Sequence, residues 1–288
     1  MKKYLHRFIL FFVIIVANNE AYSQSNLSSE VGLMFGVTSF QTDFGLRNDF
    51  ASENAATMGF GAMHYLKFFG SQYSWRSGSS FFSEHFMLRT EFVYLKNTNI
   101  KHEKEAFAPG SIKREKWDAM RGNIKMYNIG SQMEFYFFNM EDYSSYQNQR
   151  TLNPYISAGV HFSFYDTQVT SELGSNDWRN YVVYDNADNG MYDKWYLHDV
   201  AANDPDSFDG LDHKQTIFNG KGNTFGLSAG LGLRYAIADS FNLILDSRFQ
   251  YFFSDRIDGL DASKDPGNKN KDTMVYVNMG IVYVFGNY

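Results

Sequence analysis

The segment Met274–Phe285 alternates bulky apolar residues with small or polar ones. The apolar side chains recur at every second position, at Val275, Val277, Met279, Ile281, Tyr283 and Phe285. Period two is the repeat of a half-buried β-strand, because successive side chains of a strand point to opposite faces. Such a strand, with an aromatic residue at its tip, is typical of the closing strand of an outer-membrane β-barrel.

Seven earlier segments repeat this alternation. They are Glu30–Gln41, Met58–Phe69, Phe82–Leu95, Asn123–Phe138, Leu152–Tyr165, Asn223–Ile237 and Phe241–Phe253. Outer-membrane barrels have an even number of antiparallel strands. The sequence therefore predicts an all-β fold, an eight-stranded antiparallel transmembrane β-barrel located in the bacterial outer membrane.

The connections between these segments alternate in length. Those after the odd-numbered segments (42–57, 96–122, 166–222 and 254–273) are longer than those after the even-numbered ones (70–81, 139–151 and 238–240). Outer-membrane barrels combine short periplasmic turns with longer extracellular loops. We therefore expect long extracellular loops, the longest at about residues 168–222, and both ends of the barrel on the periplasmic side.

The two faces of the predicted strands differ in polarity. In Asn223–Ile237 one face is apolar from Phe225 to Ile237, whereas the other carries glycine, serine, threonine and Arg234. A soluble barrel of the lipocalin type also alternates, but it puts its apolar face inward. Because the charged residues share the face with small residues, we expect apolar side chains outside and polar side chains inside.

Composition supports this class. Aromatic residues form 18% of the chain, with 28 Phe and 20 Tyr, which fits a lipid-facing surface with aromatic girdles. The net charge is −6 and there is no basic patch, so nucleic acid is not an expected partner. The chain has no Cys, which excludes disulfides, thiol catalysis and a lipoprotein anchor.

Residues 1–23 have the organisation of a secretory signal peptide. Lys2, Lys3 and Arg7 precede the apolar run Phe8–Ala17, and small residues follow before Gln24. An uncleaved N-terminal anchor is the alternative, although the run is shorter than the roughly 20 residues that span a bilayer. We expect one mature domain, the barrel of residues 24–288.

Charged residues on the predicted inner face carry the main functional argument. They are Arg89, Glu91, Glu134, Arg234, Asp246 and Arg248. An eight-stranded barrel is only wide enough for its side chains to fill it. We therefore expect an ion-pair network that plugs the lumen, with Arg89, Glu134, Arg234 and Asp246 at similar depth. A proton or ion pathway is the alternative.

Two histidines raise further hypotheses. His161 and Ser163 have the His-x-Ser spacing of outer-membrane lipid A deacylases, but their neighbours Ile156–Phe164 turn them inward, away from a membrane substrate. We expect satisfied lumen residues there and no catalytic site. His64 falls on the lipid face of its strand, so we expect a local bulge or an interfacial position.

The predicted loop of residues 168–222 has ten carboxylates against four lysines or arginines. Asp204, Asp206, Asp209 and Asp212 form its densest acidic stretch. Carboxylates suit Ca²⁺, but Asp185–Gly190 lacks the ligand pattern of an EF-hand loop. Solvated turn chemistry is the simpler interpretation, so we expect no cofactor and keep Ca²⁺ in this loop as the alternative.

Two motifs carry a family resemblance. Glu30–Phe50 (EVGLMFGVTSFQTDFGLRNDF) and Ser254–Leu260 (SDRIDGL) resemble a group of uncharacterised Bacteroidota outer-membrane barrels. The chain is similar, more distantly, to PorG-type barrels of the type IX secretion and gliding machinery. That resemblance implies anchoring of periplasmic machinery to the outer membrane. The chain has no long periplasmic domain that would document this role.

Three functional hypotheses remain. The first is a non-enzymatic barrel in contact with outer-membrane lipid that acts as a scaffold or accessory of envelope or secretion machinery, with periplasmic or outer-membrane protein partners. The second is a surface-binding barrel whose acidic cap engages a cation, glycan or protein. The third is an outer-membrane lipid-modifying enzyme.

Overall fold

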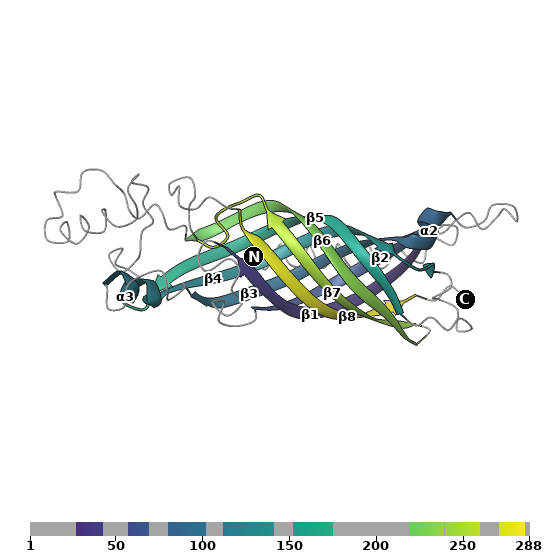
Figure 1. The fold of residues 1–288 in the computed structure, drawn as a ribbon, viewed down its shortest axis with the longest axis horizontal. Coiled ribbons are helices and arrows are strands. Elements are labelled where there is room, and N and C mark those ends of the chain that lie inside the picture. The colour runs from purple at the N-terminus through teal and green to yellow at the C-terminus, as the bar shows by residue number, and fades with distance from the viewer. Residues whose placement is uncertain are drawn as a thin grey trace, which may run out of the picture.

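The computed structural model describes residues 27–42, 57–68, 80–101, 112–140, 152–174, 219–238, 240–259 and 271–285. Eight antiparallel strands follow one another around a closed barrel, and β8 pairs with β1 to close it (Figure 1). The predicted eight-stranded antiparallel barrel is confirmed. The strands are β1 Leu27–Gln41, β2 Thr57–Phe68, β3 Phe86–Lys101, β4 Met120–Tyr136, β5 Leu152–Ser171, β6 Gly220–Ala238, β7 Phe241–Phe252 and β8 Thr273–Val284.

Two short helices mark the two ends of the barrel. The helix α3 (Ile112–Ala119) lies between β3 and β4 at the left end in Figure 1, and α2 (Phe81–His85) lies between β2 and β3 at the right end. We call these the loop end and the turn end. The connections at the loop end include the longest one, residues 172–219, and the turn end includes the shortest, residues 239–240.

The helix α2 corrects the predicted start of the third strand at Phe82. Ser80 caps this helix, since its Oγ accepts a hydrogen bond from the amide of Ser83 at 3.2 Å. Serine at this position, followed by an acidic residue in the first turn, is a helix-start signal that competes with the local apolar alternation. The chain becomes extended only from Phe86, where β3 begins.

The strands β3 to β6 extend further towards the loop end than predicted; β3, for example, ends at Lys101 and not at Leu95. β5 continues to Ser171 and β6 begins at Gly220, so the expected loop of residues 168–222 narrows to 172–219. The outward residues of these extensions include Asp166 and Lys221, which are polar. The alternation of apolar and polar residues in the sequence therefore ends where the apolar outer wall ends. The strands themselves continue beyond that edge.

The outer wall of the barrel is apolar. Leu33, Phe225 and Leu231 are 68, 63 and 66% exposed. Exposed apolar side chains occupy outward positions of β1, β2 and β5 to β8, whereas those of β3 and β4 are half-buried. On β4 the apolar stretch from Tyr127 to Phe135 continues to Phe137. At about 3.3 Å per residue and a strand tilt of 35–45°, this stretch is about 25 Å high, the height of the apolar band of an outer-membrane barrel.

Among the described residues, no helix is both long enough and apolar enough to cross a bilayer.

The interior changes character along the barrel axis. Towards the turn end the charged side chains lie among buried apolar ones such as Met87, Ile244 and Val282. Towards the loop end the interior is filled mainly by buried apolar side chains such as Phe40, Leu95, Ile124 and Met274. We expected polar side chains throughout the lumen, so this apolar half is a correction. It lies where β3, β4 and β5 extend beyond the membrane-facing wall, and there the barrel packs like an ordinary soluble core.

The segment after β7 folds over this apolar half. Ile257 is fully buried, and its carbonyl oxygen accepts a hydrogen bond from Thr167 Oγ1 of β5 at 2.7 Å. The Ile257 amide donates to Asp272 Oδ2 at 3.0 Å, and the Ser254 amide donates to Thr224 Oγ1 at 3.0 Å. These hydrogen bonds fix Ile257 in place, and its side chain closes the loop end of the lumen.

Candidate functional site: the lumen network

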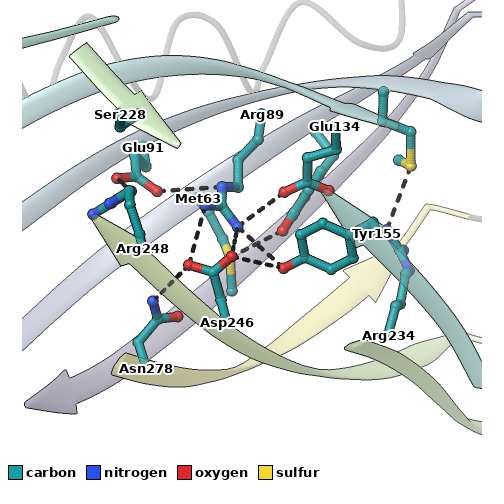
Figure 2. A network of polar contacts seen from close by, with 12 residues as sticks. Met63, Arg89, Glu91, Glu134, Tyr155, Ser228, Arg234, Asp246, Arg248 and Asn278 are labelled. Carbon is teal, nitrogen blue, oxygen red and sulfur yellow. Dashed lines mark hydrogen bonds and ion pairs between the residues drawn. The ribbon is translucent and has the colours of Figure 1, made fainter. Parts of the chain in front are cut away.

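Arg89 lies at the centre of the charged half of the lumen. Its guanidinium is completely buried and contacts three carboxylates. Nη1 lies 2.9 Å from Glu134 Oε1 and 3.4 Å from Asp246 Oδ2, and Nε lies 3.3 Å from Glu91 Oε2. Figure 2 shows the Arg89 head group between these three side chains, which come from β3, β4 and β7.

Hydrogen bonds from neutral side chains orient the Asp246 carboxylate. Tyr155 donates its hydroxyl to Oδ2 at 3.0 Å, and Asn278 donates its amide to Oδ1 at 3.0 Å. Gly232 on β6 makes room for Tyr155, because a Cβ at this position would overlap the tyrosine ring and lie 2.8 Å from the carbonyl oxygen of Leu245. The missing side chain of Gly232 therefore leaves the space that Tyr155 fills at the centre of the narrow barrel.

Arg234 forms a second pair nearer the turn end. Its Nη2 contacts the carboxylate of Glu30 on β1, a residue that the sequence analysis did not assign to the lumen. Its Nη1 lies 3.5 Å from the hydroxyl of Tyr136, which in turn donates to Glu134 Oε2 at 2.6 Å. Tyr136 therefore links the Arg234–Glu30 pair to the central cluster.

Arg248 forms the third pair, on the loop-end side of Arg89. Its Nη1 contacts Glu91 Oε1, and its guanidinium carbon lies 5.3 Å from the ring centre of Tyr276. Glu91 is thus shared by Arg89 and Arg248. The shared Glu91 joins the Arg248 pair to Arg89, and Tyr136 joins the Arg234 pair to Glu134, so the three pairs form one chain of contacts along the lumen.

All six predicted lumen residues lie inside the barrel and are almost fully buried. The structure brings Arg89, Glu134 and Asp246 together as expected from their depth. It places Arg234 apart from them, paired with Glu30. Register and depth along one strand predict which face a side chain occupies. They do not predict which of several distant strands will supply its partner.

Some buried polar atoms beside this network have no hydrogen-bond partner within the described residues. They include both amide atoms of Gln132, Nε and Nη2 of Arg248 and the hydroxyl of Tyr276. Gln132 is 1% exposed and lies opposite Arg89 in the β3–β4 ladder. Unpaired buried polar atoms cost stability, so these side chains reduce the stability that the network contributes.

His161 and Ser163 both point into the lumen, as expected from their neighbours. They do not bond to each other. His161 Nε2 lies 2.9 Å from Ser228 Oγ, and Ser163 donates to Asn128 Oδ1 at 2.9 Å. Both residues are at most 1% exposed. A nucleophile needs a base and access to substrate, and this geometry provides Ser163 with neither.

His64 lies at an outward position of β2 without a bulge, because the ladders with β1 and β3 are continuous there. Its Nε2 lies 2.6 Å from Ser29 Oγ, a neighbour on the same face. Of the two expected explanations, the bulge is therefore absent and the interfacial position remains a prediction. A hydrogen bond to serine supplies the polar partner that an imidazole needs on an apolar wall.

The predicted cation loop lies outside the described residues, including Asp204, Asp206, Asp209 and Asp212. Within the described part of the chain, there is no group of three or more His, Cys, Asp or Glu side chains that could hold a metal ion.

No protein-family model matches the chain, and no curated protein matches it in sequence. Several solved structures are similar to it at low identity. Neisserial surface protein A is 12% identical, with 91% of this chain and 98% of that chain covered and a TM-score of 0.39. A major outer membrane protein from Thermus thermophilus is 10% identical, with 90% and 100% covered and a TM-score of 0.45. The outer membrane enzyme PagL is 8% identical, with 88% and 97% covered and a TM-score of 0.30.

These scores are all below 0.5, so the assignment of this chain rests on its own barrel. A closed sheet has no unpaired edge, and over the height of its apolar outer wall the charged side chains of the described residues lie inside the barrel. That combination is stable in a bilayer and is found in the bacterial outer membrane. The chain is an outer-membrane β-barrel.

Proposed function

We propose that this protein is a non-enzymatic, non-conducting barrel that acts as a membrane-embedded scaffold or accessory of envelope or secretion machinery. The observation that supports this proposal is the filled lumen. Arg234 and Glu30 occupy its turn end, Arg89 occupies its centre, and Ile257 covers its loop end. With its lumen filled and its wall in lipid, the barrel offers water-soluble partners only its two ends.

The more distant similarity of the chain to PorG-type barrels supports the same proposal, since it implies anchoring of periplasmic machinery. The orientation that we propose follows from connection length. The loop end, with residues 172–219, faces the outside of the cell, and the turn end, with residues 239–240, faces the periplasm. Machinery in the periplasm would therefore meet the turn end.

Two alternatives are distinguished by where partners or products appear. A surface-binding barrel would use the acidic loop of residues 172–219, which contacts the outside in this orientation. A lipid-modifying enzyme would need an accessible nucleophile, and the burial of His161 and Ser163 weighs against that pair. The scaffold hypothesis alone expects protein contacts at the turn end.

Site-specific photo-crosslinking in native envelopes tests the proposal. A crosslinking residue is placed at Glu84 on α2 at the turn end, and in a second variant at Lys271 at the loop end. We expect one dominant protein adduct from the turn-end variant. Adducts from the loop-end variant alone would favour the surface-binding alternative and overturn the scaffold proposal.

Two measurements on the purified barrel complete the test. In planar bilayers we expect no steady conductance, because the charged network and the apolar side chains fill successive parts of the lumen along the barrel axis. Incubation with envelope lipid should release no fatty acid. Hydrolysis that is lost in Ser163→Ala would assign the protein to the enzymes instead.

A further inference from the structure

The outward face of β3 to β6 carries a row of charged side chains that runs from strand to strand through paired ladder positions. The ladders place Lys96 of β3 opposite Lys125 of β4, Lys125 opposite Asp166 of β5, and Asp166 opposite Lys221 of β6. Neighbouring strands lie about 4.8 Å apart, so these four positions are consecutive neighbours across the wall. We call them the lysine row. Three lysines and one aspartate leave it with a net positive charge.

The lysine row lies at the loop-end border of the apolar wall. Two residues below it on each of three strands are Tyr94, Tyr127 and Phe164, and the Tyr94 and Tyr127 ring centres are 4.9 Å apart. Aromatic girdles mark the interface between the hydrocarbon of a membrane and its head groups. The lysine ammonium groups therefore lie at the level of the head groups.

Asp166 is the acidic ladder neighbour of Lys125 and Lys221. Lys96, Lys125 and Lys221 are exposed, and none forms an ion pair with another residue in the part of the chain that the structure describes. Arg121, further along β4, differs, since its Nη2 lies 2.9 Å from Glu172 Oε1. Like charges directly opposite each other on neighbouring strands are destabilising. An anion between Lys96 and Lys125 would remove that repulsion.

We propose that the lysine row binds the phosphate groups of the phosphorylated glycolipid in the outer leaflet of the outer membrane. Lys96 and Lys125 together hold one phosphate, and Lys221, separated from them by Asp166, contacts a second. The acyl chains of the same lipid lie on the aromatic and aliphatic wall below. Lipid is the fitting partner because the row continues directly from a surface that lipid covers. The inference goes beyond the scaffold role and rests on the loop end facing outward.

Binding of a bisphosphorylated lipid A-type glycolipid to the purified barrel in neutral detergent tests this proposal, with native mass spectrometry as the measurement. The same glycolipid without its phosphates is the ligand control. We expect K96Q/K125Q to weaken binding of the phosphorylated lipid by about 25-fold, since each of the two lysines near an anionic lipid surface contributes roughly a factor of five. We expect Asp166→Asn to strengthen binding, because it removes the acid from the row.

Lys271→Gln is the protein control, since it neutralises an exposed lysine at the loop end outside the row. It should leave lipid binding unchanged. Equal binding of the dephosphorylated lipid, or unchanged binding by K96Q/K125Q, would overturn the proposal. So would full competition by inorganic phosphate at the concentration of the lipid, because the row would then bind phosphate without lipid. If K96Q/K125Q does not fold, Lys221→Gln and Asp166→Asn still test the sign of the effect in opposite directions.

Discussion

Arg234 on β6 pairs with Glu30 on β1, although β7 and β8 lie between these strands in the barrel wall. The pair therefore spans the lumen and does not merely join neighbours within the sheet. Glu30 lies on the strand that closes the barrel, opposite Val284 of β8. A contact between β6 and β1 holds the closing strand from inside, in addition to its backbone ladders.

Arg234→Ala should destabilise the barrel by about 3–5 kcal/mol, because it leaves the Glu30 carboxylate buried without its cation. The free energy of unfolding in denaturant, followed by tryptophan fluorescence in detergent, measures this. The double variant Arg234→Ala with Glu30→Gln should recover part of the loss, since the uncompensated charge is then gone.

Arg256→Ala is the matched control, because Arg256 is an exposed arginine at the loop end. Its unfolding free energy should stay within about 0.5 kcal/mol of the parent. Equal stability of Arg234→Ala and the parent would mean that water hydrates Glu30. It would then favour the ion pathway over the plug.

Gln132→Met should raise the free energy of unfolding, whereas Arg234→Ala should lower it. Both amide atoms of Gln132 are buried without a hydrogen-bond partner among the described residues, and the side chain is 1% exposed. Methionine has a similar length and no amide to desolvate, so we expect a gain of about 1–2 kcal/mol in the free energy of unfolding. A clear loss of stability would show that this amide is hydrogen-bonded in solution, and the lumen beside Arg89 would have to be wet.

The sequence predicts the faces of this barrel better than its contacts. Alternation correctly places Phe225 outside and Arg248 inside, because the period of a strand is fixed by covalent geometry. It overlooks Glu30 as the partner of Arg234, since that contact depends on how the sheet closes. Partners separated by 204 residues are outside the reach of a local pattern.

The sequence pattern also fails to predict the apolar half of the lumen, for a related reason. On β4 the inward residues change from Asn128 to Met126 and Ile124 while the outward ones change from Tyr127 to Lys125. Both faces change polarity at the same height, where the strand leaves the membrane. A prediction that expects the same face to stay apolar along the whole strand therefore ends the strand too early, as it does at the loop ends of β3, β4, β5 and β6.

Gly36→Ala should weaken the seam between β1 and β8. A Cβ on Gly36 would overlap the carbonyl oxygen of Val277 and lie 2.6 Å from Asn278 Cα, both on β8. Backbone atoms cannot rotate away as a side-chain end can, so we expect a loss of about 1–3 kcal/mol or more. Unfolding free energy and heat-modifiable gel mobility both report this loss of stability.

Ala229→Gly, on the exposed face of β6, is the control and should change stability by less than about 1 kcal/mol. Equal effects of the two substitutions would contradict the tight seam.

Cysteine labelling on intact cells tests the orientation on which the proposed partners depend. The chain has no Cys, so Leu173→Cys after β5 and Ala238→Cys at the end of β6 each introduce a unique thiol. Both residues are exposed, at the loop end and the turn end respectively. We expect a membrane-impermeant maleimide to label Leu173→Cys on intact cells. It should label Ala238→Cys only after the outer membrane is permeabilised.

The reverse pattern would place the loop end in the periplasm. The lysine row would then face the inner leaflet, where the phosphorylated glycolipid is absent, and the turn end would no longer be available to periplasmic machinery. Labelling of both thiols on intact cells would indicate a damaged membrane, which a periplasmic marker protein detects independently. The labelling pattern of two thiols therefore decides which leaflet the row contacts before any lipid is added, and it fixes which end of the barrel a crosslinked partner must reach.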